Sequence, residues 1–195
     1  MSTTLDPTRR LNKRDAARQT TNIETPFDRD DLIISKTDKR GTIISCNDIF
    51  AKMSGWSEEE LMGSNHNLIR HRDMPQIAFQ LCWDIIRDKR EFFGYVKNFR
   101  KDGGYYWVFA YITGNWNDDG EITSYTSYRR YAPRLAVNTM IPIYKLLLDA
   151  EKKGGMKASE KAMNDYLASK GYGSYDNFIV DLQLKANASL VKNNI

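Results

Sequence analysis

The sequence lacks any long run of apolar residues, and this lack bounds where the protein can work. No stretch of its 195 residues approaches the roughly 18 to 20 consecutive apolar residues that a membrane-spanning helix needs. The first residues, Met1 to Thr4, are mostly polar and do not have the apolar core of a secretory signal peptide. We therefore expect a cytoplasmic protein that has no membrane span.

Cysteine and histidine are scarce, with two of each. Cys46 and Cys82 form no CxxC pair and have no histidine at metal-ligand spacing, so we interpret both as reduced thiols inside apolar segments. Neither predicts a metal site or a disulfide scaffold. Both histidines, His66 and His71, fall within one short polar stretch.

Basic charge is also scarce once the N-terminus is set aside. The formal net charge is +4, and residues 1–20 carry +3 of it, because they hold five basic and two acidic side chains. A basic, threonine-rich segment without apolar periodicity is typical of a flexible arm, which we assign to residues 1–26. Nucleic-acid binding through this arm is a minority alternative.

Apolar periodicity and turn sequences after the arm predict an α+β fold. The expected strands are 32–37, 42–46, 92–100, 105–116 and 122–130. Short turns at 38–41, 101–104 and 117–120 connect the strands that follow one another directly. The expected helices are two short ones after the caps Asn47 and Ser57, a third short helix or turn over 66–73, and a longer one over 76–87. This order predicts a five-stranded antiparallel sheet with short helices on one face and a pocket beneath them.

Pro133 marks the end of the predicted sheet domain, residues 27–132. Beyond it, apolar side chains recur at helical spacing over residues 136–152, 159–169 and 176–191, with glycines as stops between them. We therefore assign residues 133–195 to a C-terminal helical extension. The extension is too short to hold a large core of its own, so it should pack on the sheet domain or on a second copy of the chain.

The stretch from His66 to Pro75 is the strongest candidate for a functional site. It holds both histidines, two arginines and Asp73 between two helical segments. Arginine offers a planar fork to phosphate groups, and histidine or asparagine can hydrogen-bond a ring or a ribose. The simpler interpretation is a local ion pair between Arg70 and Asp73, which would be worth only tenths of a kcal/mol. The residues alone leave both interpretations open.

Several strings in the chain match a family pattern. They are Asn47-Asp48-Ile49-Phe50, Ser54-Gly55-Trp56, Glu60-Leu61-Met62-Gly63, the stretch from His66 to Pro75, the run from Val96 to Gly103, and Tyr106-Trp107-Val108. Together they resemble a PAS domain, and more narrowly the PAS sensor of the bacterial aerotaxis receptor family. The resemblance implies a noncatalytic PAS sensor that binds FAD noncovalently and passes redox or oxygen information to a chemotaxis or other signalling partner. A homodimer is one expected form.

The resemblance also implies which residues contact the cofactor. They are His66, Asn67, Arg70, His71, Asp73, Trp83, Phe92, Asn98, Trp107 and Tyr111. The expected response is a change in hydrogen bonding to Asn98 and the strands, followed by a shift in the packing of residues 133–195. Three alternatives remain: haem held by His66 or His71, a cofactor-free dimerisation module, and a flavin enzyme with His66 as its acid or base.

Four positions depart from the family pattern. Arg72 stands in place of a proline, Phe92 in place of a tryptophan, and Phe109 and Tyr111 in place of an arginine and an asparagine. Cofactor contact near Tyr111 therefore depends on its hydroxyl group. The chain also has Gly63-Ser64-Asn65 where a light sensor would need a reactive cysteine, so light-driven adduct chemistry is not expected.

Overall fold

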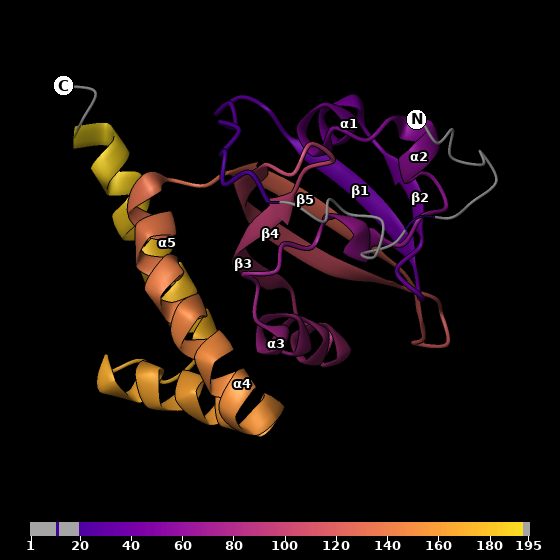
Figure 1. Ribbon diagram of the computed structural model, residues 1–195. Coiled ribbons are helices and arrows are strands. Elements are labelled where there is room, and N and C mark those ends of the chain that lie inside the picture. Colours follow the sequence, from indigo (N-terminus) through magenta and orange to yellow (C-terminus); the bar gives the residue numbers. More distant parts are fainter. Residues whose placement is uncertain (1–10, 12–19, 193–195) are drawn as a thin grey trace.

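The computed structural model describes residue 11 and residues 20–192, and a five-stranded antiparallel sheet forms its centre (Figure 1). The strands are β1 (Ile33–Asp38), β2 (Ile43–Cys46), β3 (Phe92–Phe99), β4 (Tyr105–Trp116) and β5 (Ile122–Tyr131). Their spatial order is β2-β1-β5-β4-β3, so the first and last strands of the chain pair in the middle of the sheet. The predicted fold class is confirmed.

Four helical segments connect β2 to β3 and cover one face of the sheet, called the pocket face below. They are α1 (Asp48–Ser54), α2 (Glu58–Leu61), the 3-10 helix η1 (His66–Ile69) and α3 (Gln76–Arg87). Local sequence explains two of the starts. The side chain of Asn47 accepts the N–H of Phe50, and Ser57 and Glu60 form a reciprocal capping box. Gly55, with φ of 73°, ends α1 in the left-handed region.

The register of the sheet decides which side chains reach the pocket face. Ser35 of β1 is paired with Ser127 of β5, and Arg129 of β5 is paired with Ala110 of β4. Because opposite residues in an antiparallel pair point to the same side, these four side chains share one face. Trp107, which is three residues from Ala110, therefore points to the opposite face.

The C-terminal extension packs on β3, one of the two edge strands of the sheet. It consists of α4 (Arg134–Ser169) and α5 (Tyr175–Lys192), and the backbone of α4 is non-helical at Gly154 and Gly155. The chain changes direction there (Figure 1), so the predicted glycine stop is confirmed. The hydroxyl of Tyr144 on α4 donates to the carbonyl oxygen of Tyr95 on β3 at 2.5 Å. The extension thus packs on the sheet, as one of the two predicted alternatives requires.

Most of the predicted N-terminal arm lies outside the described residues. Within it, the buried Leu11 donates its N–H to the Oγ of Ser64 at 2.9 Å. Thr25 donates its N–H to the carbonyl oxygen of Tyr105 at 2.8 Å. These two described positions therefore lie against the sheet domain.

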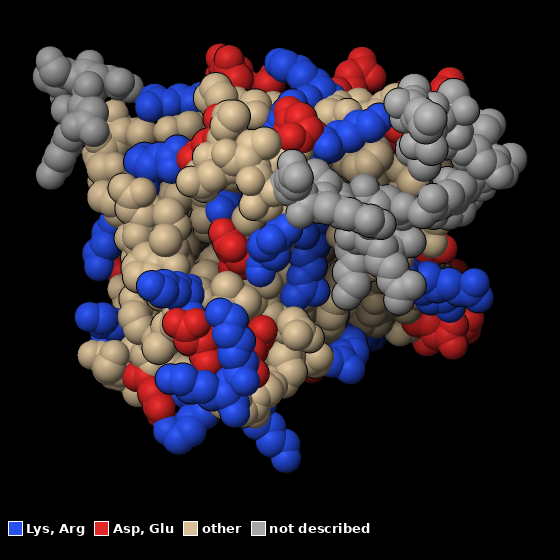
Figure 2. All heavy atoms as spheres, in the orientation of Figure 1, with Lys and Arg blue, Asp and Glu red and all other residues tan. Residues whose placement is uncertain are grey.

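Charged side chains of both signs are interspersed on the face of the molecule shown in Figure 2. Among the described residues, no continuous basic surface of the kind that follows a nucleic-acid backbone is seen on that face. In the part of the chain that the structure describes, no helix is both long and apolar enough to cross a membrane.

Candidate functional site

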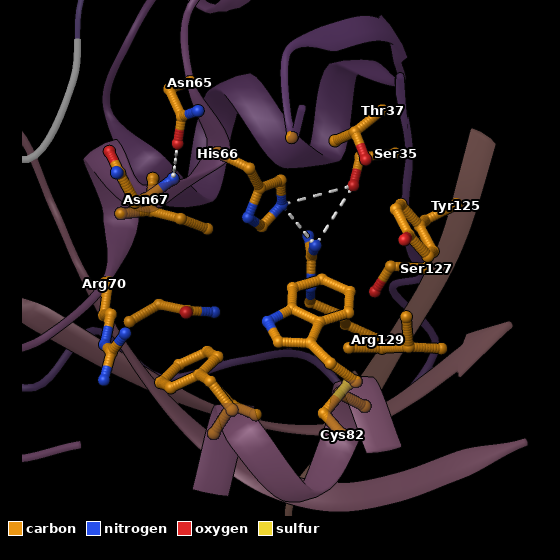
Figure 3. A pocket seen from close by; sticks show the side chains of 18 of the residues that line it. Ser35, Thr37, Asn65, His66, Asn67, Arg70, Cys82, Tyr125, Ser127 and Arg129 are labelled. Carbon is orange, nitrogen blue, oxygen red and sulfur yellow. Dashed lines mark hydrogen bonds between the residues drawn. The ribbon is translucent and has the colours of Figure 1, made fainter. Parts of the chain in front are cut away.

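A cavity of about 460 Å³ lies between the pocket face of the sheet, η1, α3 and the turn between β1 and β2 (Figure 3). Its volume lies within the range of small-molecule sites in proteins. The lining side chains form three zones: apolar walls, a polar inner end and a basic rim. The walls include Ile69, Phe79, Cys82, Val96, Ala110 and Ile112, the inner end Ser35, His66, Asn98, Ser127 and Arg129, and the rim Lys39, Arg40 and Arg70.

Arg129 is the central residue of the inner end. Its side chain comes from β5 and is only 3% exposed. Nη2 donates to the Oγ of Ser35 at 3.0 Å and to the Nε2 of His66 at 2.5 Å, and Figure 3 shows the three groups pointing at one another. Burial lowers the pKa of Arg129 to about 10, so the guanidinium stays charged at neutral pH. The residues that line the cavity include no aspartate or glutamate.

This contact fixes the protonation state of His66. A guanidinium can only donate, so Nε2 of His66 must accept, and its proton then lies on Nδ1. Burial and, after it, the charge of Arg129 hold the pKa of His66 well below 6.5. The imidazole is therefore neutral at physiological pH, and Asn65 next to it anchors η1 by accepting the N–H of Asn67 at 3.0 Å.

Three polar atoms of the inner end have no hydrogen-bond partner among the described residues. They are Nη1 of Arg129, Nδ2 of Asn98 and Oγ of Ser127, and all three are fully buried. Buried polar groups in native proteins nearly always have partners, and an unpaired buried cation is especially costly. Buried polar atoms without a hydrogen-bond partner are therefore concentrated in residues that line the inner end of the cavity.

The basic rim is held in place by a compact turn and a ring contact. Asp38 accepts the backbone N–H groups of Arg40 and Thr42, each at 2.8 Å, so its carboxylate is engaged within the turn. Across the mouth, the guanidinium of Arg70 lies 3.8 Å from the ring centre of Phe79. The lining of the cavity thus includes three basic side chains that are at least partly exposed, Lys39, Arg40 and Arg70.

Five of the ten residues predicted to contact a cofactor line this cavity. They are His66, Asn67, Arg70, Trp83 and Asn98. Trp83 is 39% exposed, and its ring lies against Tyr125 of β5 at 5.0 Å. The structure therefore brings together the part of the predicted set that comes from η1, α3 and the pocket face of β3.

The other five predicted residues do not line the cavity. His71 and Asp73 lie past the edge of β3, where the His71 ring stacks on Phe99 at 4.3 Å and Asp73 pairs with Lys97 at 2.7 Å. Burial, followed by the charge of Lys97, lowers the pKa of His71 to about 4. These two residues therefore fasten the η1–α3 connection to β3.

The three aromatic residues of the set lie outside the cavity for two reasons. Trp107 and Tyr111 point to the opposite face of the sheet, where Trp107 stacks on Tyr144 and the hydroxyl of Tyr111 donates to Glu91. Phe92 is on the pocket-face side of β3, but its ring stacks on Tyr175 of α5 at 5.9 Å. Their predicted contact with a cofactor has no support from their positions.

Sequence reasoning missed Arg129, Ser127 and Ser35, together with the rim residues Lys39 and Arg40. A signal was present in β5, where Tyr125, Ser127 and Arg129 alternate with Thr126, Tyr128 and Arg130. A central strand that places a charged residue and small polar residues on its inner face is unusual. The face could not be assigned without knowing the register with β1 and β4.

Both cysteines are free thiols, as predicted. Cys82 lies on α3 in the wall of the cavity, and burial raises the pKa of its thiol. The thiol is therefore protonated and acts as a small apolar side chain there.

Comparison with known proteins agrees with this geometry. Residues 43–129 match the family model described as PAS fold. The aerotaxis receptor of Escherichia coli (strain K12) is 37% identical over 127 residues, which are 65% of this chain and 25% of that protein. A nitrogen fixation regulatory protein of Klebsiella oxytoca is 32% identical over 99 residues, or 51% of this chain and 20% of that protein. The chain thus spans a quarter or less of the length of these relatives.

A solved structure shares the fold at low sequence identity. It is described as "Flavin Analogue Sheds Light on Light-Oxygen-Voltage Domain Mechanism", with a TM-score of 0.51 and 15% identity, over 57% of this chain and 84% of that one. This likeness concerns the fold alone. Together with the family model, it shows a PAS fold over residues 43–129, in a chain that is similar in sequence to the aerotaxis receptor.

Proposed function

We propose that the cavity binds FAD noncovalently and that the protein is a redox sensor. The observation that carries this proposal is the buried Arg129, whose Nη1 has no partner among the described residues. Arg129, Asn98 and Ser127 line the same cavity, whose walls include apolar side chains. A flavin ring has an apolar body and one edge of oxygen and nitrogen acceptors, so its two parts suit the walls and the inner end.

The residues of the inner end would set the electrostatics around the bound ring. When bound, a flavin supplies a ring that takes up and returns electrons. Arg129 holds a fixed positive charge in a low-dielectric site, where it favours negative charge on whatever it contacts. His66 stays neutral and keeps the guanidinium aimed into the cavity. Asn98 offers an amide donor from β3, the strand that the helical extension covers.

The basic rim supports a dinucleotide rather than an uncharged ligand. Lys39, Arg40 and Arg70 surround the mouth of the cavity, and arginine forks match phosphate oxygens. The pyrophosphate of FAD would lie at this rim when the ring occupies the interior.

A signalling role is supported by the relatives, which are a receptor and a regulatory protein by name. We propose that the protein acts in the cytoplasm, alone or as a homodimer, on a chemotaxis or other signalling partner. The helical extension packs on β3, which also contributes Asn98 to the cavity. This arrangement provides a path from the cavity to the surface that a partner would contact.

The site gives less support to the alternatives. Axial ligation of haem needs a free imidazole nitrogen, but Nε2 of His66 accepts from Arg129 and His71 lies outside the cavity lining. A flavin enzyme would need His66 as acid or base, which its low pKa and its bond to Arg129 disfavour. We therefore propose a noncatalytic protein, for which purified material should not turn over NAD(P)H.

Titration of the ligand-free protein with FAD, followed by quenching of flavin fluorescence, tests the proposal. Arg129→Met should weaken FAD binding at least about tenfold, which corresponds to about 1.4 kcal/mol. Arg130→Met is the matched control, because Arg130 is the next residue of β5 and is exposed on the opposite face. Equal FAD affinity of the two variants would contradict the assignment of the inner end.

A further inference from the structure

Helix α3 begins without a capping side chain of its own. Pro75 stands at its N-cap and makes no side-chain hydrogen bond, and its first turn holds no acidic residue. The N–H of Ile77 instead donates to Oε1 of Glu151 at 2.9 Å. Glu151 belongs to α4, so the extension supplies the acceptor that the start of α3 needs.

Arg70 lies against the same end of α3. Its guanidinium lines the cavity and rests on Phe79, a residue in the first turns of α3 that also lines the cavity. Burial lowers the pKa of Arg70, and the charge of Glu151 opposes that effect. Since the cavity lining holds no carboxylate, the negative charge that acts on Arg70 comes from the extension.

We propose that Glu151 sets the affinity of the cavity for anionic ligands by competing with them for Arg70. The ligand class in this proposal, a flavin phosphate, rests on the proposed function. Glu151 touches no ligand in this account and acts through Arg70, so it is a positioning residue.

The competition has a reciprocal consequence. A phosphate that binds Arg70 weakens the attraction between Arg70 and Glu151. The weaker attraction loosens α4 from the start of α3. Thermodynamic linkage requires that docking of α4 weakens phosphate binding by the same factor by which bound phosphate weakens docking of α4. The charge of one residue on the extension thereby connects occupancy of the cavity to the docking of α4.

Glu151→Gln separates charge from capping, because the amide oxygen can still accept the N–H of Ile77. In titrations of the full chain, this variant should bind FAD and FMN about fivefold more tightly than the wild type, the low end of usual coupling factors. Riboflavin has no phosphate, so its affinity should not change. A merely structural role for Glu151 would shift all three affinities alike, and that result would overturn the proposal.

Asp149→Asn is the matched control. It removes one negative charge from the same helix, but Asp149 pairs with Lys152 at 3.3 Å. Its affinities for the three flavins should equal those of the wild type. Hydrogen exchange gives a second measurement: FMN should increase exchange at the Ile77 amide in the wild type and leave it unchanged in Glu151→Gln.

Inorganic pyrophosphate distinguishes failure of this inference from failure of the proposed function, because it is an anion without a flavin ring. Tighter pyrophosphate binding by Glu151→Gln than by the wild type supports the inference even where no flavin binds. Equal pyrophosphate binding by the two proteins overturns it, whatever the flavins do.

Discussion

Arg129 illustrates at the scale of one residue how a proposed binding site works against stability. The guanidinium is buried on β5 with a serine and a neutral histidine as its partners, and no carboxylate among the cavity-lining residues balances it. Removing such a charge from water costs several kcal/mol, which neutral hydrogen bonds offset only in part. A cation in this position is better explained by what it binds than by what it stabilises.

Replacement of Arg129 by methionine should therefore stabilise the ligand-free protein while it weakens FAD binding. We expect the free energy of unfolding to rise by about 1 to 3 kcal/mol, as when other buried charges are exchanged for apolar side chains of similar volume. Urea denaturation of both proteins without flavin measures the difference. A loss of more than about 1 kcal/mol would mean that Arg129 is mainly a structural residue.

His71 makes a separate prediction about pH. Its folded-state pKa of about 4 lies below the ordinary value near 6.5, so between these values the unfolded chain binds a proton that the folded chain does not. The contribution of neutral His71 to the free energy of unfolding is therefore fully present above about pH 6.5, and it is lost as the pH decreases toward 4. Because the neighbouring Asp73 is 55% exposed, solvent screens this site, and we expect His71 to contribute about 1 to 2 kcal/mol of this loss.

His71→Asn isolates this contribution, because asparagine does not titrate and can still accept the N–H of Asp73. Urea midpoints of the wild type and the variant, measured at several pH values across that window, give the comparison. The variant should lose less stability than the wild type on acidification. Parallel curves would show that His71 is not the group responsible.

At the scale of elements, local signals specified where helices and strands lie, but not which face each strand turns inward. The turns at Gly103 and Gly120 and the caps Asn47 and Ser57 lie where they were predicted. In β4, however, both faces are apolar or aromatic, so alternation alone could not show that Ala110 and Ile112 line the cavity while Tyr111 points away. The pairing of β4 with β5 determines which face of β4 turns toward the cavity, and this pairing joins residues that are distant in sequence.

Gly94 tests how the extension docks on β3. A Cβ atom at this position would lie 2.8 Å from the hydroxyl oxygen of Tyr175 and 2.7 Å from the ring of Phe92. Gly94→Ala should therefore push α5 from the sheet and destabilise the fold by about 1 to 3 kcal/mol. Urea denaturation should show a lower free energy of unfolding, and hydrogen exchange along α5 should become faster.

Gly173→Ala serves as the control for Gly94→Ala. A Cβ atom at Gly173 would meet only the side chain of Asn177, at 3.9 Å. The free energy of unfolding of the Gly173→Ala variant should therefore change little. Similar unfolding free energies for the two variants would show that β3 and α5 are not closely packed at Gly94.

At the scale of the whole molecule, the extension shares one of two apolar cores with the PAS domain. Side chains of α3, β3, α4 and α5 share a buried cluster that includes Ile85, Tyr95, Leu147 and Ile179. The site draws on separate parts of the chain, since the turn at Lys39, η1 and β5 meet only in the folded state. Sequence reasoning therefore found the contiguous stretch around His66 and missed Arg129, which lies 63 residues away.

The central claim is that this cavity holds FAD, and the visible absorption spectrum of the 195-residue protein tests it most directly. After incubation with FAD and removal of excess cofactor by gel filtration, we expect the absorption bands of an oxidised flavin, at one flavin per chain. Heating the protein should release the cofactor as FAD, which chromatography identifies. A colourless protein, or one with the spectrum of haem, would contradict the account.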